Sequence, residues 1–178
     1  MVHQSSALAA AAGQTTNALP SRAYAVKVLD KVHILKEKKQ KYVRVEKEAL
    51  SLLLHCPGVV TLYHTFQDRE SLYFVLELAP NGELLQHVQA LGSLDITSAT
   101  FYAAQLADAL DGIHRAGVIH RDIKPENVLL DEHMRIRVTD FGSARIVPRG
   151  GDEQAEERTG SFVGTAEYAV SYTHLTLP

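Results

Sequence analysis

The sequence predicts an α+β protein of two lobes. Short apolar strand patterns and one basic helix gather in the first half of the chain, and a long helical pattern leads the second half. The chain has 178 residues, of which 46% are hydrophobic and 22% charged, a balance typical of globular proteins. At roughly 150 residues per domain, this length corresponds to one domain and little more.

Charge and cysteine content argue against several classes of protein. Eighteen Lys and Arg residues against 21 Asp and Glu residues give a net charge of −3, whereas nucleic-acid binders usually carry a basic excess. The single cysteine, Cys56, can form neither an internal disulfide nor a Cys-based zinc site, so we expect a reducing compartment. No apolar run reaches the ~18 residues of a membrane span, and the N-terminus lacks the basic start of a signal peptide.

The first lobe begins with a strand and a basic helix. Residues 24–29 are apolar and β-branched, which predicts a strand. Residues 31–48 carry seven basic and three acidic side chains, a local net charge of +4. Apolar positions between residues 43 and 54 recur at helical spacing, and we expect Pro57-Gly58 to end this helix.

The remaining elements follow in order along the chain. Two more strands are expected over residues 59–63 and 72–78, joined by a polar turn. Residues 101–113 place apolar side chains around one broad helix face, and Gly117 can cap this helix. Two short strands are expected at residues 128–130 and 136–139. A mobile loop is expected at residues 148–160, which are Gly-rich and acidic.

The strongest functional signal is the octapeptide HRDIKPEN at residues 120–127, which Asp140-Phe141-Gly142 follows. Either motif alone could be an ordinary polar turn. Both together, thirteen residues apart from Asn127 to Asp140, make that interpretation improbable. The two motifs resemble those of the eukaryotic protein kinase family.

This resemblance implies a two-lobed protein kinase-like fold that transfers phosphate from ATP, with Mg²⁺ as the metal cofactor. Asp122 would accept the proton of the attacking hydroxyl, and Lys124 would lie along the transferring phosphate. Asn127 and Asp140 would supply the hard oxygen ligands that suit Mg²⁺. A lysine at position 124 is similar to the Ser/Thr-directed kinases and unlike the Tyr-directed ones.

Upstream, Lys27 resembles the ATP-binding lysine of kinases, with Glu46 as its ion-pair partner. Glu46 could instead pair with Lys39 or Lys47 on a solvated helix face. The resemblance also assigns a nucleotide pocket and a stack of side chains that links the lobes. The hinge positions are Glu77 and Ala79, the ribose position is Glu83, and the adenine-ring positions are Ala25 and Leu129. The stack consists of Leu50, Leu62, His120 and Phe141. For Ala25 and Leu129, ordinary core packing is an equal alternative.

Further motifs resemble the AGC group of kinases, and within it the phosphoinositide-dependent kinases. These motifs are TFQD at residues 65–68, NGEL at 81–84 and SFVGTAEY at 161–168. The resemblance implies a phosphorylation site at Ser161, whose phosphate would pair with Arg121. The alternative is an unmodified loop serine.

The same resemblance implies a docking groove on the small lobe for an aromatic hydrophobic motif of substrate kinases. The local charge of +4 would suit a phosphorylated motif. A solvated helix face is the alternative interpretation of the lysines. The expected lining is Lys31, Ile34, Leu35, Val43, Leu72 and Phe74, and the expected phosphate side is Lys47, Thr65 and Gln67.

The fold is expected to be incomplete at both ends. Gly13 is the only glycine before Lys27, where kinases have a glycine-rich loop, and nothing after Tyr168 matches the family. We therefore expect the chain on its own to be inactive and prone to aggregate. We expect an unassigned start at residues 1–20 and a partial small lobe at residues 21–79. The front of the large lobe is expected at residues 80–168 and a non-native tail at residues 169–178.

The intact protein is expected to phosphorylate Ser/Thr residues of proteins, chiefly activation loops of other AGC kinases. The alternative is a non-catalytic pseudokinase or docking module that retains only the groove, which the missing glycine-rich loop favours. The joint presence of Lys27, Glu46, Asp122, Asn127 and Asp140 argues against it. We expect no nucleic-acid partner, no membrane contact from this segment, and a cytoplasmic location with recruitment to the plasma membrane through a lipid-binding domain elsewhere in the protein.

Overall fold

The computed structural model describes residues 23–147. The predicted loop at residues 148–160, the predicted phosphorylation site Ser161 and the segments 1–20 and 169–178 lie outside the described residues. Between residues 23 and 147, no helix combines the length and the apolar character needed to cross a membrane.

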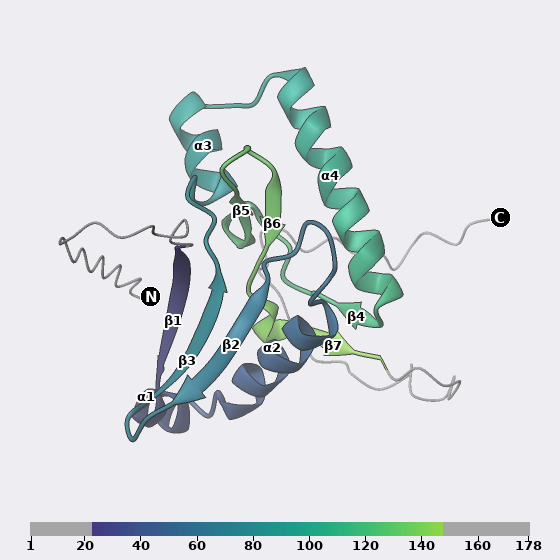
Figure 1. The fold of residues 1–178 in the computed structure, drawn as a ribbon. Coiled ribbons are helices and arrows are strands. Elements are labelled where there is room, and N and C mark those ends of the chain that lie inside the picture. The colour runs from purple at the N-terminus through teal and green to yellow at the C-terminus, as the bar shows by residue number, and fades with distance from the viewer. Residues whose placement is uncertain (1–22, 148–178) are drawn as a thin grey trace, which may run out of the picture.

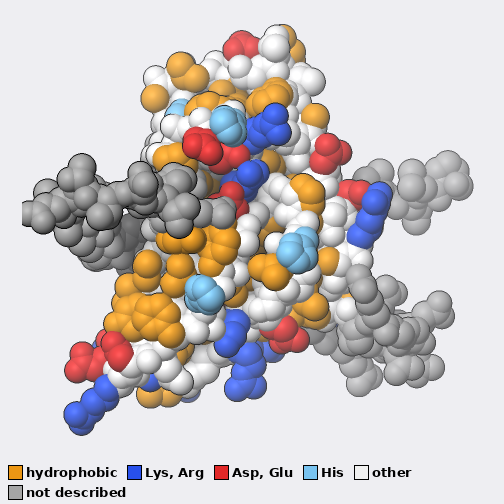
Figure 2. All heavy atoms as spheres, viewed as in Figure 1, with side chains coloured by type: hydrophobic (Ala, Val, Ile, Leu, Met, Phe, Trp, Pro, Cys, Tyr) orange, Lys and Arg blue, Asp and Glu red, His pale blue; other side chains and the backbone are white. Residues whose placement is uncertain are grey.

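The first lobe contains a three-stranded antiparallel sheet in the order β1–β3–β2 (Figure 1). Its strands are β1 Tyr24–Asp30, β2 Leu62–Gln67 and β3 Ser71–Glu77. Side chains alternate along β1, so Lys27 and its neighbours two residues away share one face and Val26 and Val28 the other. Val26 and Val28 are exposed, and Figure 2 shows hydrophobic side chains gathered over this region of the sheet.

The predicted basic helix is two helices, α1 Lys31–Lys36 and α2 Gln40–Leu52. Asp30 caps α1, because its Oδ1 accepts a hydrogen bond of 2.6 Å from the His33 amide. Lys38, between the helices, has a φ of 53°, a left-handed conformation that interrupts the helical ladder. The expectation that Pro57-Gly58 ends the helix was also wrong, since α2 ends at Leu52.

The strand predicted over residues 59–63 was placed too early, because β2 begins at Leu62. Val59 and Val60 contact the second lobe instead. The Val60 amide donates to the Val138 carbonyl at 3.0 Å, and the Val138 amide donates to the Gly58 carbonyl at 2.7 Å. This apolar segment is buried for a tertiary reason that local patterning does not reveal: it joins the two lobes.

The second lobe contains the predicted long helix, α4 Ile96–Arg115, which is confirmed. Asp95 caps its start by accepting a 2.9 Å hydrogen bond from the Ser98 amide, and Gly117, with a φ of 77°, follows its end. The predicted strands near residues 128 and 136 are also confirmed. The other elements here are α3 Leu84–Leu91, β4 Val118–Ile119, η1 Pro125–Asn127, β5 Val128–Leu130, β6 Ile136–Val138, η2 Phe141–Ser143 and β7 Arg145–Ile146.

Among residues 23–147, one hydrophobic core runs through both lobes. It includes Ala49 and Leu50 of α2, Phe141 of η2, and Ala109 and Ile113 of α4, all almost fully buried. Figure 1 shows the β5–β6 hairpin between the sheet and α4. Burial of these side chains fixes the catalytic-type motifs, which lie on the loops beside this hairpin, relative to the sheet.

A close approach between the lobes at Gly58 predicts a sharp effect of one methyl group. Gly58 has a φ of 75°, and a Cβ there would lie 2.8 Å from Ala109 Cβ. We expect Gly58→Ala in the intact protein to lower the free energy of unfolding by about 2–4 kcal/mol, from overpacking and backbone strain together. Gly92→Ala, at a φ of 77° with nothing within 4 Å, is the matched control and should lose about 1 kcal/mol. Equal losses in denaturant unfolding would contradict this account.

Candidate active site

Lys27 and Glu46 form an ion pair between the sheet and α2. Lys27 Nζ lies 2.6 Å from Glu46 Oε1. Glu46 lies one turn before Leu50 on the buried face of α2 and is only 5% exposed. It therefore does not lie on a solvated helix face, the alternative in which it would pair with Lys39 or Lys47.

Burial dominates the electrostatics of Glu46. Removal from water raises the pKa of its carboxyl above the ordinary value, while the charge and hydrogen bond of Lys27 act in the opposite direction. Asp140 adds a smaller raising influence. The Asp140 Oδ1 atom lies 3.8 Å from Lys27 Nζ, so Lys27 stands between a buried carboxylate and a half-exposed one.

Asp122, Lys124 and Asn127 form a second polar cluster. Asp122 Oδ2 lies 3.1 Å from Lys124 Nζ. The Asn127 side-chain amide donates to the Asp122 carbonyl oxygen at 2.8 Å and to Asp122 Oδ2 at 3.1 Å. Asn127 is buried at the end of η1, so a fixed donor holds both the backbone and the side chain of Asp122.

His120 supports this cluster from the core. Its Nδ1 accepts a 3.2 Å hydrogen bond from the Asp122 amide, and its Nε2 lies 2.9 Å from the Thr139 carbonyl oxygen. These partners require a neutral ring with the proton on Nε2. Burial lowers the pKa of His120, which favours the same neutral form. The ring packs edge-on against Phe141, and the expected stack of Leu50, Leu62, His120 and Phe141 is buried throughout.

Two residues of the site have left-handed backbone conformations. Arg121 has a φ of 67° and Asp140 a φ of 61°. Such conformations cost roughly 1 kcal/mol for residues other than glycine. The surrounding contacts maintain them: the Thr139 amide donates to the Asn127 carbonyl at 3.0 Å, and Phe141 is fully buried.

Asp140 and Asn127 carry oxygen atoms of the kind that Mg²⁺ prefers. In the part of the chain that the structure describes, no cluster of three or more His, Cys, Asp or Glu side chains could hold a metal ion. Mg²⁺ is commonly bound through one or two carboxylates together with substrate phosphates and water. The half-exposed carboxylate of Asp140 and the amide of Asn127 fit a metal ion held jointly with nucleotide phosphates.

The predicted nucleotide-pocket residues surround the junction of the lobes. Ala25 shares the Lys27 face of β1, and Glu83 forms an antiparallel bridge with Leu129 of β5. Glu77 ends β3 and Ala79 follows it, but the Glu77 side chain is engaged with Arg137. Among the described residues β1 is an edge strand, and the cavity between α1, α2 and the β2–β3 hairpin includes none of these positions.

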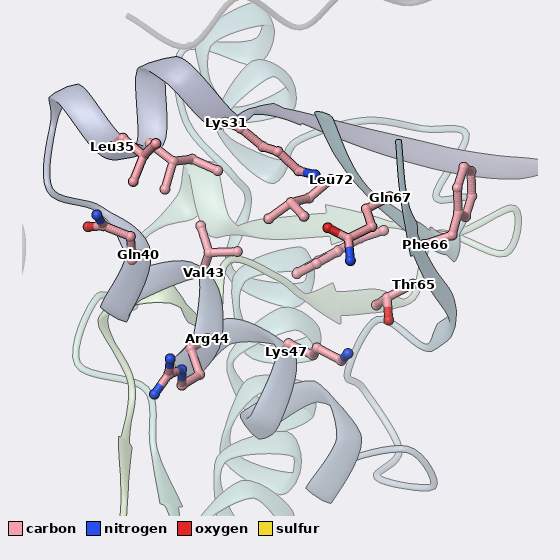
Figure 3. A pocket seen from close by; sticks show the side chains of 12 residues that line it. Lys31, Leu35, Gln40, Val43, Arg44, Lys47, Thr65, Phe66, Gln67 and Leu72 are labelled. Carbon is pink, nitrogen blue, oxygen red and sulfur yellow. The ribbon is translucent and has the colours of Figure 1, made fainter. Parts of the chain in front are cut away.

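All nine predicted groove residues line one cavity of about 490 Å³ between α1, α2 and the β2–β3 hairpin (Figure 3). Val43 and Leu72 lie at its centre, and Lys47 extends toward Thr65 at one side. Lys31 Nζ donates a 2.5 Å hydrogen bond to the Asp68 carbonyl oxygen, so this lysine also fastens the hairpin to α1.

Sequence reasoning missed three lining residues, Gln40, Arg44 and Phe66. Gln40 and Arg44 could have been found, since they share one helix face with Val43 and Lys47 by their spacing of three, four and seven residues. Figure 3 shows Arg44 extending away from the Lys47 side of the groove. Phe66 lies between Thr65 and Gln67 on β2 and stacks on Tyr73, a tertiary contact that no local pattern predicts.

Comparison with known proteins identifies the family. The family described as "Protein kinase domain" matches residues 10–171. The match begins upstream of residue 21, where the partial small lobe was predicted to start, and includes the candidate active site and the groove.

Several relatives are about half identical to this chain. Serine/threonine-protein kinase ksg1 of Schizosaccharomyces pombe is 52% identical over 156 residues, covering 83% of this chain and 26% of that protein. 3-phosphoinositide-dependent protein kinase 1 of Homo sapiens is 51% identical over 148 residues, covering 83% of this chain and 26% of that protein. Serine/threonine-protein kinase PKH2 of Candida albicans is 53% identical over 157 residues, covering 86% and 17%. The chain therefore spans about a quarter or less of these relatives.

The buried ion pair gives a test of the site's energetics. Lys27→Met in the intact protein leaves the Glu46 carboxylate buried without its partner, and we expect unfolding free energy to fall by about 2–4 kcal/mol. The second change Glu46→Leu should restore most of this loss, because no buried charge remains. Arg115→Met, which breaks the exposed pair with Asp111, should cost about 0.5 kcal/mol or less. A double variant no more stable than Lys27→Met would refute this reasoning in urea unfolding.

Proposed function

The chain belongs to the protein kinase family, and from that membership we propose that the intact protein transfers the γ-phosphate of ATP to Ser/Thr hydroxyls of protein substrates. The observation that carries the proposal is the Lys27–Glu46 ion pair with Asp140 beside it, 3.8 Å from Lys27. In this arrangement the Lys27 ammonium, which could bind phosphate, lies next to the half-exposed carboxylate of Asp140, which suits a metal ion.

The chain's own side chains would divide the work of phosphoryl transfer, in which position and charge matter more than covalent chemistry. Asp122, held by Asn127, would orient the attacking hydroxyl and accept its proton as the new O–P bond forms. Lys124, beside Asp122, would offset negative charge on the transferring phosphate. When bound by Asn127 and Asp140, Mg²⁺ would neutralise phosphate charge.

Lys27 would bind the α- and β-phosphates, and Glu46 would hold it in place. We further propose that backbone groups of Glu77 and Ala79 pair with the adenine edge. Glu83 would bind the ribose, and Ala25 and Leu129 would pack on the adenine ring. The bridge between Glu83 and Leu129 supports this assignment, because it brings the ribose and adenine positions together.

The likeness to phosphoinositide-dependent kinases supports a more specific proposal: the substrates are activation loops of other AGC kinases. Such substrates would dock through a phosphorylated aromatic motif in the groove. The groove suits this motif, because Val43, Leu72 and Phe74 offer an apolar floor and Lys47 an exposed cation at its side.

Regulation and location are further proposals. Phosphorylation of Ser161 would order the activation loop by pairing with Arg121. In support, the Arg121 Nε atom is buried and has no hydrogen-bond partner within residues 23–147. We propose that the intact protein acts in the cytoplasm and at the plasma membrane, and that the 178-residue chain alone is inactive because the family's glycine-rich loop is missing from its sequence.

Replacing the proposed base tests the reaction. We expect Asp122→Asn in the intact protein to lower kcat by at least about 100-fold, because no group then accepts the hydroxyl proton. Binding of Mg-ATP should be nearly unchanged. Transfer of labelled phosphate and nucleotide affinity are measured side by side, with Asp111→Asn on α4 as the control. Binding of Mg-ATP by the unaltered protein without any transfer would favour a pseudokinase instead.

A charge reversal tests the groove. We expect Lys47→Glu in the intact protein to weaken binding of a phosphorylated aromatic peptide by about tenfold, since a charge-assisted contact becomes a repulsion. Lys41→Glu makes the same change in net charge on the same helix but outside the groove, and should have little effect. The affinity of each variant is measured by calorimetry. Equal weakening by both changes would defeat the proposal of a specific phosphate side.

A further inference from the structure

A cluster of charged side chains joins the end of β3 to the β5–β6 hairpin. The Arg137 Nε atom lies 2.9 Å from Glu77 Oε1, and the Nη2 atom of the same guanidinium lies 2.9 Å from Asp131 Oδ2. We call Glu77, Arg137 and Asp131 the hinge triad. Figure 2 shows acidic and basic side chains together on the face where β3 meets this hairpin.

Each carboxylate of the hinge triad is fixed by further bonds. Glu77 Oε2 accepts hydrogen bonds from the Thr61 amide at 3.2 Å and the Thr61 hydroxyl at 3.0 Å. Asp131 Oδ1 accepts from the amides of His133 and Arg135, both at 2.9 Å. The guanidinium therefore joins two anchored acceptors, a task that suits the fork geometry of arginine and not the single point charge of lysine.

The side chains of the hinge triad are mostly buried. Arg137 and Glu77 have side-chain exposures of 24% and 19%, and Asp131 of 9%. Water screens such contacts much less than a surface pair. Partial burial alone would raise the pKa of Glu77. The hydrogen bonds from Arg137 and Thr61 outweigh this effect and leave the pKa of Glu77 below its ordinary value.

The hinge triad lies at one end of the segment that connects the lobes. Glu77 is the last residue of β3, and residues 78–83 lead into α3. At the other end of this segment, the Asn81 amide donates to the Leu130 carbonyl at 3.1 Å, and the Leu130 amide donates to the Gly82 carbonyl at 2.8 Å. Both ends of the connection are thus fastened to the same hairpin.

We propose that Arg137 is a positioning residue for nucleotide binding: through Glu77 it fixes the backbone of the lobe connection against the β5–β6 hairpin. The inference rests on the proposed function, in which backbone groups at residues 77–79 pair with adenine. Arg137 lies opposite Leu129 in the β5–β6 ladder, so one hairpin carries both the ring-packing residue and the guanidinium that holds the hinge. Fixing these groups before the nucleotide arrives lowers the ordering cost of binding.

The test uses the intact protein and two nucleotide measurements: the Kd of a fluorescent ATP analogue and the steady-state KM for ATP. We expect Arg137→Gln to raise both by roughly five- to tenfold, with kcat changed by no more than about twofold. Arg135→Gln, on the same hairpin with an exposed side chain, is the matched control and should change neither. A rise in kcat with unchanged KM would overturn the proposal, because the hinge triad would then restrain motion and not position the nucleotide.

A double-variant cycle separates positioning from general stability. Glu77→Gln should also raise the Kd, and Arg137→Gln should add little in that background, because Arg137 acts through Glu77. Additive effects would overturn the proposal. If Arg137→Gln does not fold, the isosteric Glu77→Gln decides the outcome by its own Kd. Failure of the proposed function is distinguishable, since the unaltered protein would then transfer no phosphate, whether or not it binds the nucleotide analogue.

Discussion

The buried carboxylate of Glu46 is the constraint on which the rest of the site depends. A charge that is 5% exposed requires a close partner, and Lys27 on β1 supplies it at 2.6 Å. The pair fixes α2 against the sheet, and Leu50, one turn along the helix, then packs in the core that contains Phe141. The position of Asp140, beside Phe141, therefore follows from a contact that begins on the first strand.

Helix α2 serves two sites with two of its faces. Its buried face carries Glu46 toward the sheet, and its groove face carries Gln40, Val43, Arg44 and Lys47. The helix thus connects the groove directly to the Lys27 ion pair. Any occupant of the groove would contact the same rigid element that holds the lysine, with no intervening loop.

Local patterns predicted most of what local patterns determine. The apolar, β-branched run at residues 24–29 and the apolar face of residues 101–113 each marked a real element. The nine groove residues, which the resemblance to kinases implied and no local pattern did, line one cavity. The strand predicted at residues 59–63 was placed wrongly because Val59 and Val60 are buried against the second lobe. Val138 is 78 residues from Val60 in sequence, yet the Val60 amide nitrogen lies only 3.0 Å from the Val138 carbonyl oxygen. The Glu77–Arg137 contact could not be predicted from the sequence for the same reason. A contact between residues of two distant strands produces no periodic pattern in the sequence.

The left-handed backbone conformations of Arg121 and Asp140 mean that the site contains backbone strain. At roughly 1 kcal/mol each, they would relax toward ordinary conformations if the packing around them loosened. The core around Phe141 and His120 is what prevents this relaxation. Heat or a distant core substitution would therefore release the segments around Arg121 and Asp140 locally while the sheet and α4 remain folded. Under the proposed function, activity would then be lost before global unfolding.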